Sequence, residues 1–160
     1  MDSLLPAAHR IGALLKARNE TVCIAEGSAG GLISAALLAV PGASAYFLGG
    51  AVVYTRVARR ALLSLPDEAF AGVRASTEPY ARLLAGAARQ KFDATWAVGE
   101  SGATGPTGNR YGDAAGHACI AVVGLTEASI TLETASADRE ANMRAFAAAA
   151  LDLLEKSIRG

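Results

Sequence analysis

Residues 20–31 read ETVCIAEGSAGG, and this stretch decides how the chain folds. The apolar run VCIA at 22–25 predicts a short buried strand, which Glu26 ends. The small residues at 27–31 predict a tight turn, and the following LISAALLAV has the spacing of an amphipathic helix. In α/β proteins ligands commonly bind where a strand ends and the next helix begins, because free backbone N–H groups there attract anions. The pattern also fits a plain strand-to-helix turn without a ligand.

The composition is that of a globular chain with a substantial core. It has 160 residues, of which 52% are hydrophobic and 19% charged, and its formal net charge is zero. We therefore expect a single domain over residues 1–160. No run of like charge predicts a nucleic-acid or membrane surface, and no apolar stretch reaches the roughly 18–20 residues of a membrane-spanning helix.

The cysteines and histidines predict neither a disulfide nor a metal site. Cys23 and Cys119 both lie in apolar strand patterns, so we expect reduced core residues of a cytoplasmic protein. His9 and His117 stand alone in the sequence, and each is expected to be a surface residue or a satisfied core residue. The N-terminal segment is amphipathic and lacks the basic-then-apolar order of a signal peptide. No metal or cofactor is therefore predicted.

Helical and strand patterns alternate along the chain. Helices are expected at 3–18, 30–39, 56–64, 78–91 and 138–158, and strands at 21–26, 48–54, 95–99, 117–124 and 128–135. This alternation predicts an α/β fold, a three-layer α/β/α sandwich with a mixed, mostly parallel sheet. Because its apolar run is unbroken, the strand at 21–26 is expected in the interior of the sheet, covered on both faces.

A second glycine-rich segment, ESGATGPTGNRYGDAAG at 100–116, follows another predicted strand. Glycines allow a backbone to approach a ligand closely. Since the segments at 26–31 and 100–108 each follow a strand, we expect them to form one pocket at one end of the sheet. Tyr54 and Arg59 are expected nearby, although a basic helix face in water explains the local arginines equally well.

Six motifs occur in an order and spacing that resemble one known family. They read AEGSAGG at 25–31, PGASAYF at 41–47, GAVVYTRVAR at 50–59, ASTEP at 75–79, SGATGPTG at 101–108 and ADR at 137–139. They are similar to the A-E-S-C-T-G-G, P-G-S-S-x-x-F, G-x-V-x-Y-S-N-x-A-K, A-V-S-E-x, S-G-I-A-G-P-x-G and G-D-R motifs of the CinA C-terminal domain family, which is known for nicotinamide-mononucleotide amidohydrolase activity. The resemblance covers the whole chain.

The resemblance implies a stand-alone version of this domain that binds a small-molecule nucleotide such as nicotinamide mononucleotide. It implies no cofactor and no nucleic-acid or membrane partner, and it leaves a homo-oligomer open. The ligand-binding residues that it implies are Glu26, Gly27, Gly30, Gly31, Ser101, Gly102, Gly105, Pro106 and Gly108. The residues that it places at or beside the reaction are Ser28, Tyr54 and Arg59.

The chain departs from the family at the two positions that carry the chemistry. The family's serine nucleophile is replaced by Gly27, and the lysine that activates it by Arg59. Glycine offers no nucleophile, and an arginine with a pKa above about 12 does not act as a base near neutral pH. A serine–lysine acyl transfer needs both groups. We therefore favour a divergent member that has lost or altered the reaction but keeps a pocket for a nucleotide or another small anion.

Three alternatives to this interpretation stay open. The first is an active amidase that uses Ser28, one position along from the family's nucleophile. The second is a different reaction through Glu26 and Glu100. The third is a non-catalytic protein-interaction module, which an exposed apolar patch away from the loops would favour. Arg59 is expected to grip a phosphate or carboxylate through two parallel hydrogen bonds, unless it pairs with Glu26 or Asp67 and closes the site.

Overall fold

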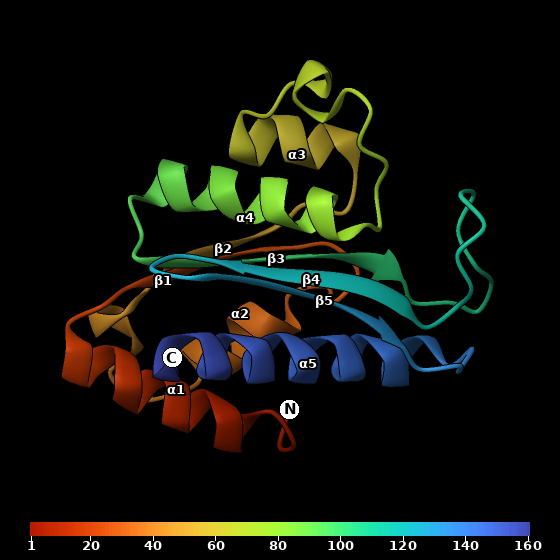
Figure 1. Ribbon diagram of the computed structural model, residues 1–160. Helices are drawn as coiled ribbons and strands as arrows, with labels where there is room; N and C mark the ends of the chain where they lie inside the picture. Colours follow the sequence, from red (N-terminus) through yellow and green to blue (C-terminus); the bar gives the residue numbers. More distant parts are fainter.

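The computed structural model describes residues 1–160 and has a five-stranded sheet between two layers of helices (Figure 1). This confirms the three-layer α/β/α sandwich. The elements are α1 (Leu5–Arg18), β1 (Val22–Glu26), α2 (Leu32–Leu38), η1 (Ala43–Ala45), β2 (Phe47–Val52), α3 (Arg56–Leu63), η2 (Asp67–Phe70), α4 (Glu78–Phe92), β3 (Trp96–Ala103), β4 (His117–Val123), β5 (Glu127–Glu133) and α5 (Arg139–Arg159).

The sheet is mixed, with the strand order β2-β1-β3-β4-β5. Strand β1 pairs in parallel with both β2 and β3, whereas β4 is antiparallel to β3 and to β5. β4 is therefore the one strand that runs against the others. Every residue of β1 is buried, which confirms the expected interior position of this strand.

Successive residues of β1 pack into two different hydrophobic cores. Val22 and Ile24 belong to the core beneath α1, α2 and α5. Cys23 and Ala25 belong to the core beneath α3 and α4, on the opposite face of the sheet (Figure 1). Because side chains alternate along a strand, a strand covered on both faces needs apolar residues at every position. Both cysteines of the chain are buried free thiols, as expected.

The expected boundary that differs most from the structure is the end of the strand at 95–99. The glycine-rich loop does not begin at residue 100, because β3 continues through Ala103. The segment 100–103 pairs with β4, and this antiparallel ladder satisfies its backbone groups. Gly102 permits the close pairing, since a Cβ there would lie 2.4 Å from the carbonyl oxygen of His117. The connection that remains outside the sheet is 104–116.

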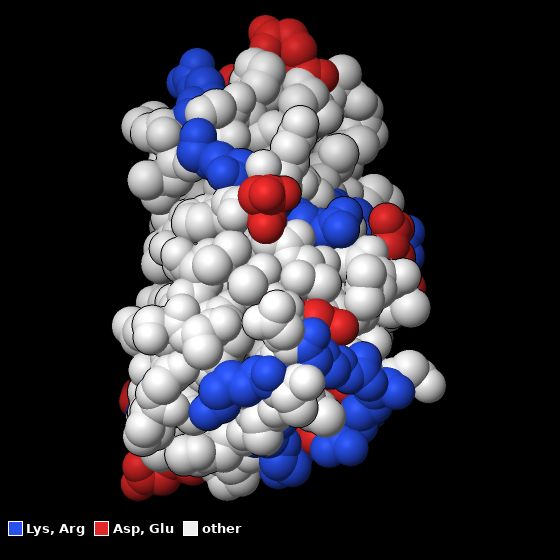
Figure 2. Space-filling model, turned by 90° about the vertical axis from the view of Figure 1, so that its left-hand side faces the viewer, with Lys and Arg blue, Asp and Glu red and all other residues white.

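The end of the molecule away from this connection carries a group of basic side chains (Figure 2). Helices α1 and α5 both end there, with Lys16 and Arg18 in the last turn of α1 and Lys156 and Arg159 in the last turn of α5. Cations near the carbonyl end of a helix are stabilising, so these positions have a structural explanation. None of the helices combines the length and the apolar character needed to cross a bilayer.

Helix α4 packs closely on β3, and alanine substitutions at two glycines test this packing. A Cβ added at Gly99 would lie 2.0 Å from the carbonyl oxygen of Ala81, a backbone atom of α4 that cannot move aside. We expect Gly99→Ala to lower the free energy of unfolding by about 3 kcal/mol or more in urea denaturation. Gly86→Ala is the matched control: nothing lies within 4 Å of that added Cβ, and alanine favours the helix by about 0.5–1 kcal/mol. Equal stability of the Gly99→Ala variant and the original chain would contradict this packing.

Candidate functional site

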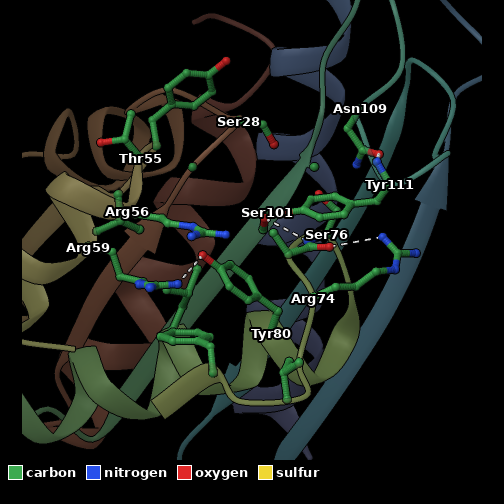
Figure 3. Close-up of a pocket in the computed structure, with 18 of the residues that line it drawn as sticks. Ser28, Thr55, Arg56, Arg59, Arg74, Ser76, Tyr80, Ser101, Asn109 and Tyr111 are labelled. Carbon is green, nitrogen blue, oxygen red and sulfur yellow. Dashed lines mark hydrogen bonds between the residues drawn. The ribbon is translucent and has the colours of Figure 1, made fainter. Parts of the chain in front are cut away.

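A cavity of about 850 Å³ lies at the carboxyl ends of β1 and β2. Its walls come from distant parts of the chain, namely 27–28, 53–57, Arg59, 73–76, 100–102 and 109–111, with Asp67, Phe70, Tyr80 and Leu84. Figure 3 shows side chains from these walls facing one another across the cavity. The first residues of both glycine-rich segments thus meet at one end of the sheet.

Glu100 organises the turn after β1. This fully buried side chain accepts hydrogen bonds from the backbone N–H groups of Gly27 (3.0 Å) and Ala29 (2.8 Å) and from the Ser28 hydroxyl. Burial raises the pKa of Glu100 to about 7, against the lowering effect of these hydrogen bonds. Ser28 is almost completely buried and is held at the cavity wall by this contact.

Glu26 caps the start of α2 and does not line the cavity. One carboxylate oxygen accepts hydrogen bonds from the backbone N–H groups of Gly31 (2.9 Å) and Ile33 (3.1 Å). The other accepts the backbone N–H (3.0 Å) and the hydroxyl (2.6 Å) of Ser34. The free N–H groups that would attract an external anion at this helix start are therefore occupied by an internal carboxylate.

Arg59 is held inside the protein by three partners. It lies on α3, which Thr55 caps by accepting the N–H of Ala58. The guanidinium forms an ion pair with Asp67, donates to the Tyr80 hydroxyl (3.2 Å) and lies 3.8 Å from the centre of the Phe70 ring. Arg59 thus pairs with Asp67, which was one of the two partners left open by the sequence. This pairing does not close the site, because the cavity beside Arg59 is open.

Tyr54 lies at the rim of the cavity, with 62% of its surface exposed. Its hydroxyl is 3.5 Å from Nη2 of Arg139, and Nη1 of the same guanidinium donates to the carbonyl of Gly105 (2.7 Å). Ser101 and Gly102 lie on the wall formed by β3, where the Ser101 hydroxyl accepts the backbone N–H of Ser76 (3.3 Å).

Several residues that the resemblance implied as ligand contacts do not line the cavity. They are Glu26, Gly30, Gly31, Gly105, Pro106 and Gly108. Gly108 instead allows the connection 104–116 to fold onto itself, since a Cβ there would lie 2.1 Å from the carbonyl oxygen of Asp113. These positions shape the loops around the cavity rather than its surface.

Two of the cavity walls carry no residue that the sequence predicted to bind a ligand. One carries Arg74 and Ser76, and the other carries Arg110 and Tyr111. The indications in the sequence were the motif ASTEP at 75–79, which includes Ser76, and the run NRY at 109–111 within a glycine-rich segment. Asn109 bends that loop, because its side-chain oxygen accepts the backbone N–H groups of Tyr111 (2.9 Å) and Asp113 (3.1 Å).

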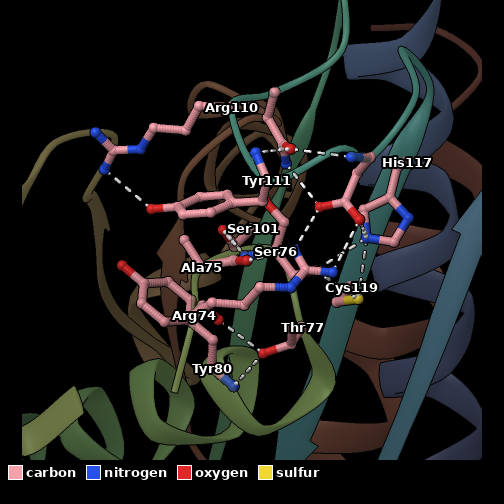
Figure 4. Close-up of polar contacts among 12 residues, drawn as sticks. Arg74, Ala75, Ser76, Thr77, Tyr80, Ser101, Arg110, Tyr111, His117 and Cys119 are labelled. Atoms are coloured by element: carbon pink, nitrogen blue, oxygen red, sulfur yellow. Dashed lines mark hydrogen bonds and ion pairs between the residues drawn. The ribbon is translucent and has the colours of Figure 1, made fainter. Parts of the chain in front are cut away.

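A cluster of polar side chains around the buried His117 joins these two walls to the sheet (Figure 4). One ring nitrogen of His117 contacts the Glu133 carboxylate, and the other lies 2.9 Å from the Ser76 carbonyl oxygen. Burial lowers the pKa of His117, but the bonds to Glu133 and Ser76 outweigh it, and the net shift is upward. Asp113, beside His117, forms two hydrogen bonds with Arg74, at 2.6 and 2.9 Å.

These features define an α/β/α protein with a ligand-sized cavity at the carboxyl ends of its parallel strands, the position where open α/β sheets bind ligands. The family model of the CinA C-terminal domain matches residues 5–158, and the chain belongs to this family.

Curated relatives and solved structures agree with this assignment. A CinA-like protein of Anaeromyxobacter sp. (strain K) is 37% identical over 147 residues, which are 92% of this chain and 36% of that protein. A CinA-like protein of Prochlorococcus marinus (strain MIT 9313) is 40% identical over 111 residues, 69% of this chain and 26% of that protein. The chain thus spans about a third or less of these relatives.

The fold also matches solved structures. A CinA superfamily protein from Klebsiella pneumoniae 700603 superposes with a TM-score of 0.90 at 24% identity, covering 98% of both chains. A competence/damage inducible protein from Agrobacterium tumefaciens gives 0.88 at 25% identity, covering 98% of this chain and 96% of its own.

The raised pKa of Glu100 makes stability depend on pH. In the folded chain Glu100 keeps its proton up to about pH 7, whereas in the unfolded chain a glutamate with the ordinary pKa of 4.5 loses it at lower pH. The raised pKa of Glu100 therefore stabilises the folded chain at low pH, and this stabilisation is lost as the pH rises from about 4.5 through 7. Glu100→Gln keeps the shape and removes the titration. We expect the difference in unfolding free energy between pH 4.5 and 7.5 to shift by about 3 kcal/mol relative to the original chain.

Urea denaturation across this pH range measures the effect. Glu127→Gln, at an exposed position on β5, is the control and should leave the pH profile unchanged. Identical profiles for the Glu100→Gln variant and the original chain would show that Glu100 titrates normally.

Proposed function

We propose that the cavity binds a phosphorylated nucleotide, such as nicotinamide mononucleotide, in a cytoplasmic protein that has lost the amidohydrolase reaction implied by its resemblance. The observation that carries this proposal is the combination of an open cavity of about 850 Å³ with four arginines on its walls and a glycine at the nucleophile position. The volume lies within the range of small-molecule sites.

The charges of the cavity support an anionic ligand. Its two carboxylates are engaged within the chain, Asp67 with Arg59 and Glu100 with the turn 27–29. Arg56 and Arg110 form no ion pair with any carboxylate. Arginine binds phosphate through parallel hydrogen bonds, so these two free cations favour a phosphorylated ligand over a neutral one.

The loss of chemistry rests on Gly27 and Arg59. Gly27 has no side chain to attack a carbonyl, and Arg59 is a permanent cation held by Asp67 and Tyr80. A Cβ added at position 27 would lie 3.9 Å from the Ser101 Cα and 3.3 Å from the Glu100 carbonyl oxygen, a tight contact with a backbone atom. The scaffold therefore accepts the family's nucleophile only if the turn after β1 and β3 move apart slightly.

Ammonia release and calorimetry test the proposal together. The unmodified chain should bind nicotinamide mononucleotide and nicotinic acid mononucleotide but release ammonia at a negligible rate, since losing a coupled nucleophile and base costs on the order of a millionfold. The double variant Gly27→Ser/Arg59→Lys should gain measurable ammonia release. Robust hydrolysis by the unmodified chain would contradict the loss of chemistry, and no heat with either nucleotide at millimolar concentration would favour an interaction module.

One observation favours a second candidate, an amidase in which Ser28 is the nucleophile. Its hydroxyl donates to Glu100, whose pKa of about 7 suits a general base near neutral pH. Glu100 is in turn oriented by two backbone N–H groups, those of Gly27 and Ala29. Here Glu100 would take the proton of Ser28 as the serine attacks the amide carbonyl.

The two candidates differ in what Ser28→Ala and Glu100→Gln do. Under the second candidate both variants abolish ammonia release, and the rate of the unmodified chain rises with pH around a midpoint near 7. Under the favoured proposal neither variant changes a rate that is already negligible. Calorimetry with nicotinamide mononucleotide on each variant shows whether the variant still binds the nucleotide and therefore still has an intact cavity.

A further inference from the structure

Three arginines surround one tyrosine at the mouth of the cavity. Arg110 donates to the Tyr111 hydroxyl (3.0 Å), and its guanidinium lies 5.1 Å from the centre of the Tyr111 ring. The guanidinium of Arg74 lies 5.7 Å from the same ring. Arg56 reaches into the cavity from α3 toward Tyr111, which comes from the facing wall (Figure 3). Arg110 first, and then Arg56, lower the pKa of the Tyr111 hydroxyl against the effect of burial.

Two of these arginines have no counter-charge. Arg74 is neutralised by its two hydrogen bonds to Asp113. Arg56 and Arg110 have no carboxylate partner, although both lie beside the same phenol oxygen. Two like charges held close together repel, and an anion bound between them would relieve the repulsion.

The other end of the cavity is unsuited to an anion. The N–H groups at the start of α2 are occupied by Glu26, and those of the turn 27–29 by Glu100. A phosphate placed there would displace or face a buried carboxylate. Arg59 does not offer a free phosphate-binding group there, because its guanidinium already contacts Asp67, Tyr80 and Phe70. The N–H donors at the floor of the cavity are thus already bonded to internal carboxylates, whereas free cations lie at its mouth.

We propose that the phosphate of the ligand binds at the mouth, between Arg56 and Arg110 and against the Tyr111 hydroxyl, and not at the turn after β1. This assignment rests on the proposed function and adds the orientation of the ligand. The uncharged or cationic end of the nucleotide then points inward, toward Glu100 and Ser28. Where the family motif quoted above has asparagine, this chain has Arg56, so the subsite is a property of this chain.

The phosphate contribution to binding tests the assignment directly. Calorimetry compares nicotinamide mononucleotide with nicotinamide riboside, which lacks the phosphate, on the unmodified chain and on Arg56→Gln/Arg110→Gln. Both side chains are exposed, so the variant should fold. The nucleotide should bind the unmodified chain at least tenfold more tightly than the nucleoside, and this preference should fall to less than threefold in the variant, because charge-assisted hydrogen bonds are lost. The preference should also weaken with added salt in the unmodified chain.

Arg60→Gln is the matched control, because Arg60 is exposed on the same helix and does not line the cavity. It should leave the preference unchanged. An unaltered preference in the Arg56→Gln/Arg110→Gln variant would overturn the subsite, as would an equal loss in the Arg60→Gln control.

Inorganic pyrophosphate separates the subsite from the proposed function. If the unmodified chain binds neither nucleotide nor nucleoside, the proposed function fails, and pyrophosphate then decides the subsite alone. Binding of pyrophosphate that Arg56→Gln/Arg110→Gln weakens at least tenfold supports the subsite. Binding that the variant leaves unaltered, or no binding at all, overturns it.

Discussion

The site depends on two buried carboxylates that lie side by side where neighbouring strands meet the turn after β1. Glu26 of β1 and Glu100 of β3 are partners in the parallel register, and both are completely buried. Burying two acids is costly unless each is fully hydrogen-bonded. Glu100 receives three donors from the turn 27–29, and Glu26 receives four from residues 31–34. Together they fix the strand–turn–helix unit, and Glu26 adds to the upward shift of the Glu100 pKa.

This constraint also bears on the ligand proposed above. In many α/β proteins the N–H groups at the start of a helix bind the anion of a ligand. In this chain internal carboxylates occupy those groups, so they are not free to bind the anion of a ligand. The positive charge lies at the mouth, on Arg56 and Arg110. The proposed ligand, which carries its phosphate at one end and a neutral or cationic ring at the other, fits this arrangement.

Arg59 stands where the resembling family has its activating lysine, and in this chain its contacts are structural. Its guanidinium braces α3 against η2 and α4 through Asp67, Phe70 and Tyr80. One of its nitrogens, Nε, has no hydrogen-bond partner in this buried setting. Together with Gly27 it removes both halves of the serine–lysine pair that the family resemblance implies, while the cavity stays open. Whether Ser28 and Glu100 supply another nucleophile and base is decided by the rate measurements on their variants.

The sequence by itself determined the elements, the layered α/β fold, the interior position of β1 and the family, because hydrophobic periodicity, turn residues and motif order are local properties. Only the tertiary structure decided that β3 continues through Ala103, since that extension depends on pairing with β4. It alone assigned Glu26 to the start of α2 and Arg59 to Asp67, and it brought the segments 73–76 and 109–111 to the cavity. The physical reason is that side-chain direction, ion pairing and cavity walls are set by packing between residues far apart in the chain, which no local pattern encodes.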